Sequence, residues 1–216
     1  MNSSMLARLF ALGSCMLATV VVAAPVEFDA DLAAIQQQWA VANYQVADHS
    51  QRVRALETLG ESAHQLALKN PGRAEALIWE GIVLSTHAGV KGGLGALGLA
   101  KKSRALLERA LQIDPYALQG SAYTSLGTLY AKVPGFPIGF GDRDKARELL
   151  LKALAINGDG IDPNYFYGEF LCDQGHCAQA LPYLEKAAKA PPRAGREVAD
   201  EGRHREVIEL MKKAKS

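Results

Sequence analysis

One 34-residue segment, 161–194, constrains the fold of this chain more than any other feature. It reads IDPNYFYGEFLCDQGHCAQALPYLEKAAKAPPRA, with small residues at its eighth and twentieth positions, Gly168 and Ala180. Leucines stand at the eleventh and twenty-fourth positions, Leu171 and Leu184, and a proline at the thirty-second. Small residues let two helices approach closely, leucines fill the space between them, and a proline ends the second helix. The spacing therefore predicts an antiparallel pair of helices joined by a tight turn.

The same register returns twice upstream. The glycine of the eighth position and the leucine of the twenty-fourth recur as Gly81 and Leu107 in 74–119, and as Gly127 and Leu150 in 120–160. These two units carry ten and seven additional residues between their halves. A repeated two-helix unit of this length resembles the tetratricopeptide repeat (TPR), which implies an all-α solenoid of stacked helical hairpins.

The segments that flank the three repeats are also expected to be helical. Residues 24–73 have the pattern of a degenerate helical pair, with apolar residues near helical spacing and a second helix that ends at Pro71. Residues 195–216 are predicted to form a capping helix over the exposed face of the last repeat. The apolar residues of that helix are Val198, Val207, Ile208 and Met211. The predicted fold is all-α, with about four hairpins plus the C-terminal cap.

The first 23 residues are typical of a secretory signal peptide. Arg8 precedes an apolar run that is shorter than the ~20 residues of a membrane-spanning helix and that ends in small residues, with cleavage expected after Ala23. Two alternatives stay open. The sequence LGSC resembles a lipobox that would make Cys15 a lipid anchor, and the run could also remain as an uncleaved anchor. The mature chain is expected in a bacterial periplasm.

Composition and motifs argue against several function classes. The net charge is +1, which gives no overall field for nucleic acid or for an anionic membrane surface. The glycine-rich stretch GVKGGLG lacks the Gly-Lys-Ser/Thr ending of a phosphate loop, and no serine stands in a nucleophile-elbow motif. The sequence thus predicts a non-enzymatic binding or scaffold protein without a cofactor.

Two cysteines remain in the mature chain, Cys172 and Cys177, on either side of a turn at Gly175. In an oxidising compartment they can pair, and the predicted disulfide would staple this turn. The alternative is a pair of free thiols. A metal site that adds His176 is not favoured, because the spacing lacks a CxxC pair and a second ligand cluster.

Residues 132–142 read KVPGFPIGFGD, which is too rich in proline and glycine for a helix and too apolar for a solvated linker. A second Gly-rich apolar stretch, 87–98, falls at the equivalent place in the first repeat. Equivalent turns of neighbouring repeats lie side by side, so both stretches are expected to be loops that meet along one edge. The edge could bind a partner or ligand, or only pack on itself. Its candidate binding residues are Val90, Leu94, Val133, Phe136, Ile138 and Phe140.

The concave face of the solenoid offers a second candidate site. The helix positions that usually face inward in such repeats change from small hydroxyls in the second repeat to acidic residues in the third. The candidate binding residues there are Thr124, Thr128, Tyr165 and Glu169. They could hold a peptide or a polar solute, or form an ordinary solvated surface.

Three blocks carry a closer resemblance: VKGGLGALGLAKKSRALLERALQIDP, GSAYTSLGTLYAKVPGFPIGFGD and GIDPNYFYGEFL. They resemble exported bacterial TPR proteins associated with tripartite ATP-independent periplasmic (TRAP) transporters, the TatT-like family. The resemblance implies a periplasmic accessory protein that engages a solute-binding protein or transporter component, could form a homo-oligomer, and could shelter an apolar or anionic solute. The residues themselves also allow an alternative function, in which the chain carries a small apolar ligand between the two Gly-rich loops.

Overall fold

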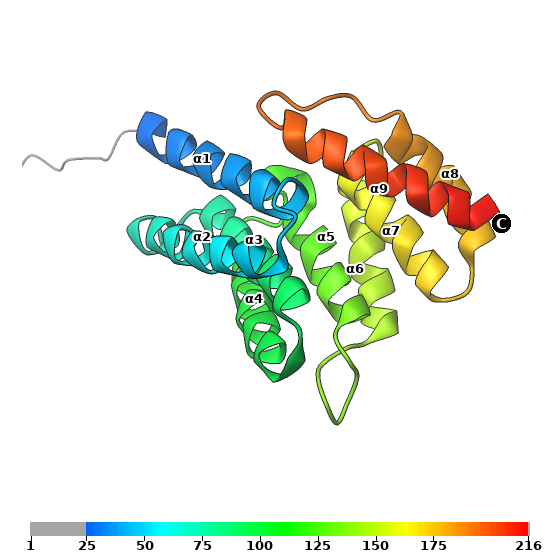
Figure 1. The fold of residues 1–216 in the computed structure, drawn as a ribbon, viewed down its shortest axis with the longest axis horizontal. Helices are drawn as coiled ribbons and strands as arrows, with labels where there is room; N and C mark the ends of the chain where they lie inside the picture. The colour runs from blue at the N-terminus through cyan, green and yellow to red at the C-terminus, as the bar shows by residue number, and fades with distance from the viewer. Residues whose placement is uncertain (1–24, 216) are drawn as a thin grey trace, which may run out of the picture.

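The computed structural model describes residues 25–215, so the predicted signal peptide and Cys15 lie outside the described residues. This part of the chain contains nine α-helices and no β-strand (Figure 1). The helices are α1 (Pro25–Tyr44), α2 (His49–Lys69), α3 (Ala74–Lys91), α4 (Gly93–Ile113), α5 (Ala117–Lys132), α6 (Arg143–Ile156), α7 (Ile161–Asp173), α8 (Cys177–Ala188) and α9 (Glu197–Lys215). None of these helices is both long and apolar enough to cross a membrane.

The hairpins α3–α4, α5–α6 and α7–α8 pack in the repeat register that the sequence predicts. A Cβ atom added to the eighth-position glycine of each would lie within 3 Å of the leucine at the twenty-fourth position. The distances are 2.9 Å from Gly81 to Leu107 Cγ, 2.8 Å from Gly127 to Leu150 Cγ and 2.8 Å from Gly168 to Leu184 Cδ2. Only glycine therefore permits this helix–helix approach. The described chain is an all-α array of TPR-type helical hairpins.

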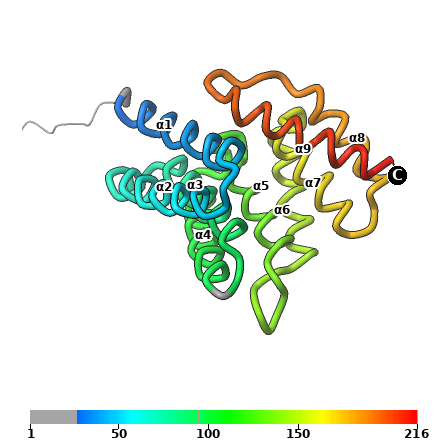
Figure 2. The backbone as a smooth tube through the Cα atoms, viewed as in Figure 1, coloured from blue at the N-terminus to red at the C-terminus, as the bar shows by residue number. Residues whose placement is uncertain are grey.

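The last helix does more than cap the array. It packs on α7 and α8, where Val207 is fully buried, but Ile208 remains 50% exposed. The chain between α8 and α9 turns back, so that α9 also reaches α1 (Figures 1 and 2). Tyr44 of α1 lies against Gly202, and the Tyr44 hydroxyl donates a hydrogen bond to Glu206 Oε2 at 3.2 Å. The two ends of the helical array thus meet.

The prediction of a loop at 87–98 is wrong. The helices α3 and α4 run through this segment and break only at Gly92, which has a φ of 62°. Val90, Ala96 and Leu99 pack against the core, and this burial offsets the poor helix propensity of the neighbouring glycines. The ten additional residues lengthen two helices instead of forming a loop.

Residues 133–142 do form a non-helical loop, which projects from the end of the α5–α6 hairpin (Figure 1). Its base is closed by two backbone hydrogen bonds, from the amide of Gly141 to the carbonyl of Pro134 at 2.9 Å and from Asp142 to Tyr130 at 3.0 Å. The Phe136–Pro137 peptide is cis. The Asp142 side chain then caps the first turn of α6, as it accepts hydrogen bonds from two backbone amides of that turn.

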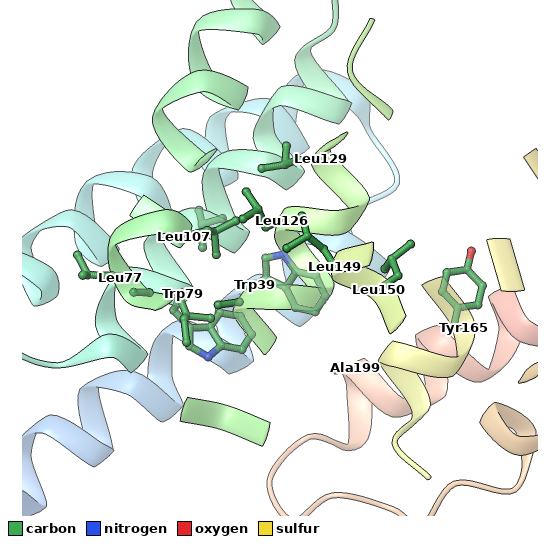
Figure 3. Packing of buried hydrophobic residues seen from close by; sticks show 14 of the residues in the cluster. Trp39, Leu77, Trp79, Leu107, Leu126, Leu129, Leu149, Leu150, Tyr165 and Ala199 are labelled. Carbon is green, nitrogen blue, oxygen red and sulfur yellow. The ribbon is translucent and has the colours of Figure 1, made fainter. Parts of the chain in front are cut away.

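The core is one continuous apolar cluster that extends from α1 to α9 (Figure 3). Leucines at the hairpin contacts are fully buried, among them Leu107, Leu126 and Leu150. At the N-terminal end, the rings of Trp39 and Trp79 meet edge to face with centroids 5.8 Å apart. This contact fixes α1 against α3 and places both indoles at the inner side of the array.

Candidate ligand-binding cavity

A cavity of about 800 Å³ lies on the concave side of the helical array. Its walls come from α1, α3, α5 and α7, the first helices of their hairpins, and the segment 190–203 closes it from the C-terminal side. The helices α3 and α5 contribute a group of small hydroxyl side chains to the lining. They are Ser85, Thr86, Ser121, Thr124, Ser125 and Thr128.

Apolar and aromatic side chains line the rest of the N-terminal half. They include Trp39, Trp79, Ile82 and Leu118, and α7 adds Phe166. The indole N–H of Trp39 donates a hydrogen bond to Thr86 Oγ1 at 2.9 Å. The indole N–H of Trp79 is buried and has no hydrogen-bond partner among the described residues. Both tryptophans of the chain therefore lie in the wall of one cavity.

A cluster of ion pairs forms the C-terminal wall and joins α7 to α9. Asp162 accepts from Arg193 Nη1 at 2.7 Å and from Arg203 Nε at 2.9 Å, while Arg193 also pairs with Asp200 at 2.6 Å. Burial opposes ionisation of Asp162, but the guanidinium groups of Arg203 and Arg193 outweigh it and lower its pKa to about 2. Asp162 is thus ionised at neutral pH, and its ion pairs hold the wall together.

Arg196 differs from the other two arginines of this wall. No carboxylate of residues 25–215 lies within 4.0 Å of its guanidinium, and its buried Nε has no hydrogen-bond partner there. The guanidinium carbon lies 4.9 Å from the centroid of the Trp79 ring. Burial and the neighbouring Arg193 lower the pKa of Arg196, so its charge is poorly compensated within the described chain.

A left-handed turn lies at the cavity wall where α5 begins. Leu118, Gln119 and Gly120 have φ values of 48°, 56° and 76°. Such values are uncommon for residues other than glycine and occur often at ligand sites. The Gln119 side chain is held by Asn157, whose Nδ2 donates to Gln119 Oε1 at 3.0 Å. This turn could not be expected from residue type, because neither Leu118 nor Gln119 favours a positive φ.

The concave-face candidates from the sequence divide into two pairs. Thr124 and Thr128 line the cavity, and the Thr128 hydroxyl donates to the Thr124 carbonyl at 2.9 Å. Tyr165 and Glu169 lie outside its lining. The Tyr165 hydroxyl donates to Glu169 Oε1 at 3.3 Å, and Glu169 also pairs with Lys132 Nζ at 3.2 Å. Glu169 therefore links α7 to α5, and the Tyr165 ring contacts α9, where the Arg203 guanidinium carbon lies 4.5 Å from its centroid.

The loop-edge candidates do not form one continuous apolar surface. Phe136 and Ile138 are 94% and 70% exposed at the loop tip. Phe140 instead packs edge to face on Tyr130 with ring centroids 5.5 Å apart, and the Arg104 guanidinium lies 4.5 Å from its ring centroid. These contacts anchor the base of the loop to α4 and α5.

The remaining loop-edge candidates belong to the packed part of this edge. Val90 and Val133 are partly buried against the core. Leu94 lies in α4, and its side chain is outside the described part of the structure. The α4 segment does touch the loop, since a Cβ added to Gly139 would lie 3.4 Å from Leu97 Cδ1.

Cys172 and Cys177 are joined by a disulfide, with their Cα atoms 4.0 Å apart. The bond links the last turn of α7 to the first residue of α8 across Gly175, which has a φ of 82°. Within the described residues, no group of three or more His, Cys, Asp or Glu side chains could hold a metal ion.

Among the cavity residues that sequence reasoning missed, Trp39, Arg196 and Arg203 come from outside the three repeats. A capping helix normally turns its charged side chains to solvent, whereas Arg203 is buried against Phe166 with its guanidinium carbon 4.4 Å from the ring centroid. A signal was present: two arginines, Arg193 and Arg196, follow the proline pair at the end of the last repeat.

No protein-family model matches the chain, and no curated protein matches its sequence. Among solved structures, the crystal structure of MamA is similar, with 19% sequence identity, coverage of 78% of this chain and 92% of that chain, and a TM-score of 0.45. This degree of similarity assigns no family, so the function is inferred from the cavity and its lining.

Proposed function

We propose that this chain is a non-enzymatic binding protein that holds a small organic solute in its concave cavity. The observation that carries the proposal is the partly open space of about 800 Å³ between α1, α3, α5, α7 and the segment 190–203. Ligand sites commonly have such volumes, with largely apolar and aromatic walls and a few polar groups. Here the two tryptophans supply the apolar wall, and the hydroxyls of α3 and α5 supply the polar groups.

The charged groups of the wall support binding over catalysis. Asp162, with a pKa of about 2 and two arginine partners, stays ionised and is a poor proton donor. Burial disfavours the charged form of Lys132, but Glu169 and Asp173 outweigh it and raise the pKa of Lys132, which keeps it an ammonium. Both groups act as structural charges.

The cavity is a better ligand site than the Gly-rich edge expected from the sequence. The first of the two expected loops is helical, and Phe140 of the second packs on Tyr130. The predicted signal peptide and the resemblance to TRAP-associated proteins support a periplasmic transport setting for this binding role. In that setting the chain is a periplasmic accessory component of a TRAP-type transport system, with a solute-binding protein or transporter component as its partner.

Native mass spectrometry of the protein purified from its own periplasm tests the proposal. The wild type should carry a small molecule that denaturation releases. Ser125→Phe should remove it, because this half-buried residue of α5 lines the cavity and the new ring would fill it. Ser62→Phe is the matched control on the exposed face of α2 and should retain the molecule. Retention by Ser125→Phe would contradict the proposal.

A second function, docking to a protein partner, is favoured by the exposed loop tip. Phe136 and Ile138 present apolar surface on a loop that two prolines stiffen, so little conformational entropy is lost on binding. Cross-linking in intact periplasm should trap a second polypeptide on the wild type and not on Phe136→Ser/Ile138→Ser. Tyr116→Ser, at a site 69% exposed outside the loop, is the control. Equal cross-linking of all three proteins would exclude the loop tip as the contact.

A further inference from the structure

The tip of the loop 133–142 exposes two large apolar side chains at one end of the molecule (Figure 1). Phe136 is 94% exposed and Ile138 is 70% exposed, and no other large hydrophobic side chain of residues 25–215 exceeds these values. The contact of Phe140 with Tyr130 holds the base of the loop against the body of the protein. Apolar side chains grouped on a projecting surface mark a contact site for a protein or a membrane.

This loop and the first half of α4 form one edge of the array. The turn between α3 and α4 lies at the same end of the array as the loop (Figures 1 and 2). Leu97 of α4 touches the loop at Gly139, where an added Cβ atom would lie 3.4 Å from Leu97 Cδ1. The Arg104 guanidinium carbon lies 4.5 Å from the Phe140 ring centroid. We call this surface, residues 89–105 and 133–141, the basic edge.

The basic edge has positive side chains and no acidic ones. Neither 81–107 nor 115–141 contains an Asp or a Glu, although the whole chain has 23 acidic residues against 24 Lys and Arg. Lys91, Lys101 and Lys102 of this edge are exposed, and none of them forms an ion pair with residues 25–215. The net charge of +1 therefore conceals a local excess of positive charge at this end of the molecule.

The carboxylates next to the basic edge are engaged elsewhere. Asp142 accepts hydrogen bonds from two backbone amides of α6, and Asp144 Oδ1 lies 3.7 Å from Arg147 Nη1. Glu108 Oε1 lies 3.7 Å from Arg104 Nε. The first turn of α6 itself has more basic than acidic side chains. These carboxylates thus leave the lysines of the edge uncompensated.

We infer that the basic edge docks on the surface of an anionic phospholipid bilayer, with Phe136 and Ile138 in the headgroup layer and the lysines at the lipid phosphates. Such binding gains from the apolar area that leaves water and from the attraction of basic side chains to anionic lipid, and the edge supplies both. Cations alone surround the apolar tip, which is the complement of a surface whose phosphates are negative. The inference is independent of any solute in the cavity, and it competes with the protein contact considered above for the same loop tip.

Sedimentation with lipid vesicles tests the inference on the mature chain that begins at Ala24, so that the predicted signal peptide does not contribute. Vesicles of phosphatidylglycerol and phosphatidylcholine in equal parts should sediment the protein. Vesicles of phosphatidylcholine alone should bind it about tenfold more weakly or less. High salt should release the protein from the anionic vesicles, because salt screens exposed charges.

A variant of the tip tests the apolar contribution. Phe136→Ser/Ile138→Ser should lower the affinity for the anionic vesicles about tenfold or more, because the side chains that enter the headgroup layer are lost. Tyr116→Ser removes an apolar side chain that is 69% exposed outside the loop, and it should bind as the wild type does.

A variant of the lysines tests the contribution of charge. Lys101→Gln/Lys102→Gln should also lower the affinity for the anionic vesicles about tenfold or more. Lys186→Gln/Lys189→Gln changes the net charge by the same amount at two exposed lysines at the end of α8, and it should bind as the wild type does.

The remaining outcomes overturn the inference. Equal binding of the wild type to both kinds of vesicle, or binding to neither, would do so, and this comparison requires no variant to fold. Equal losses in the two lysine variants would show that net charge, and not the basic edge, causes the binding. Cross-linking of the loop tip to a polypeptide, without any binding to anionic vesicles, would assign the tip to a protein partner instead.

Discussion

Replacement of Gly127 by alanine tests the close approach of α5 and α6. The added Cβ would lie 2.8 Å from Leu150 Cγ and 3.2 Å from the Leu150 backbone nitrogen. A side-chain rotation can relieve the first contact. The second requires α6 itself to move, because the atom belongs to the helix backbone. We therefore expect the overpacking to outweigh the gain in helix propensity.

The magnitude follows from a matched substitution in the same chain. Gly60→Ala places its Cβ 3.7 Å from Leu84 Cδ2, an ordinary contact in α2, so stability should rise by about 0.5–1 kcal/mol. Gly127→Ala gains the same propensity but loses about 1–3 kcal/mol to overpacking. The two Gly→Ala variants should therefore differ by about 2 kcal/mol in the free energy of unfolding.

Urea unfolding followed by circular dichroism at 222 nm measures this difference, provided that the denaturant slopes agree. Leu150→Ala alone should cost about 2–5 kcal/mol. In Gly127→Ala/Leu150→Ala, the contact with Leu150 Cγ is removed while the contact with the backbone nitrogen stays, so the double variant should lose about 1 kcal/mol less than the sum of the single losses. Additivity, or equal stability of Gly127→Ala and Gly60→Ala, would refute the packing described for this hairpin.

Three further predictions concern the disulfide, the ion-pair cluster and the loop. Reduction of Cys172–Cys177 should raise the mass by two hydrogens and lower stability by about 2 kcal/mol, the value for a loop of this length; two alkylatable thiols in the native extract would contradict it. The pKa of Asp162 is lowered from 3.8 to about 2, so its contribution is complete above pH 3.8 and is lost as the pH falls to 2. That loss amounts to about 2 kcal/mol, and acid titration of unfolding should show none of it in Asp162→Asn. Phe136→Ser should leave the melting temperature unchanged, whereas Phe140→Ser should cost about 1–3 kcal/mol, because only Phe140 packs on the body of the protein; equal effects on melting would show that the loop is not anchored as described.

The hairpins were predictable because the contacts that define them are local in sequence. Gly168 and Leu184 are sixteen positions apart, and a fixed spacing in one segment reports directly on their contact. The prediction of a loop at 87–98 was wrong because the structure of this segment is decided by packing rather than by a local sequence signal. Its glycines are a local signal for a turn, and burial of apolar neighbours such as Leu99 against the core overrides that signal.

The cavity was only partly predictable. Thr124 and Thr128 follow from repeat numbering, because inward positions recur within each unit. Arg196 and Trp39 do not, because they come from segments on either side of the repeats. Their positions depend on the contact between α1 and α9, and no repeat pattern specifies that contact.

The meeting of α1 and α9 has a consequence for how the chain folds. In an open helical array each unit contacts only its neighbours, so stability is a sum of local contributions and folding can begin anywhere. Here Tyr44 and Glu206, separated by 162 positions, form a hydrogen bond that joins the first helix to the last. This bond forms only after α9 has been synthesised and all the intervening hairpins are in place, which raises the contact order and slows the final step. Early helices stay without their last partner until that step, so truncation at the C-terminus should loosen α1 at the far end of the sequence.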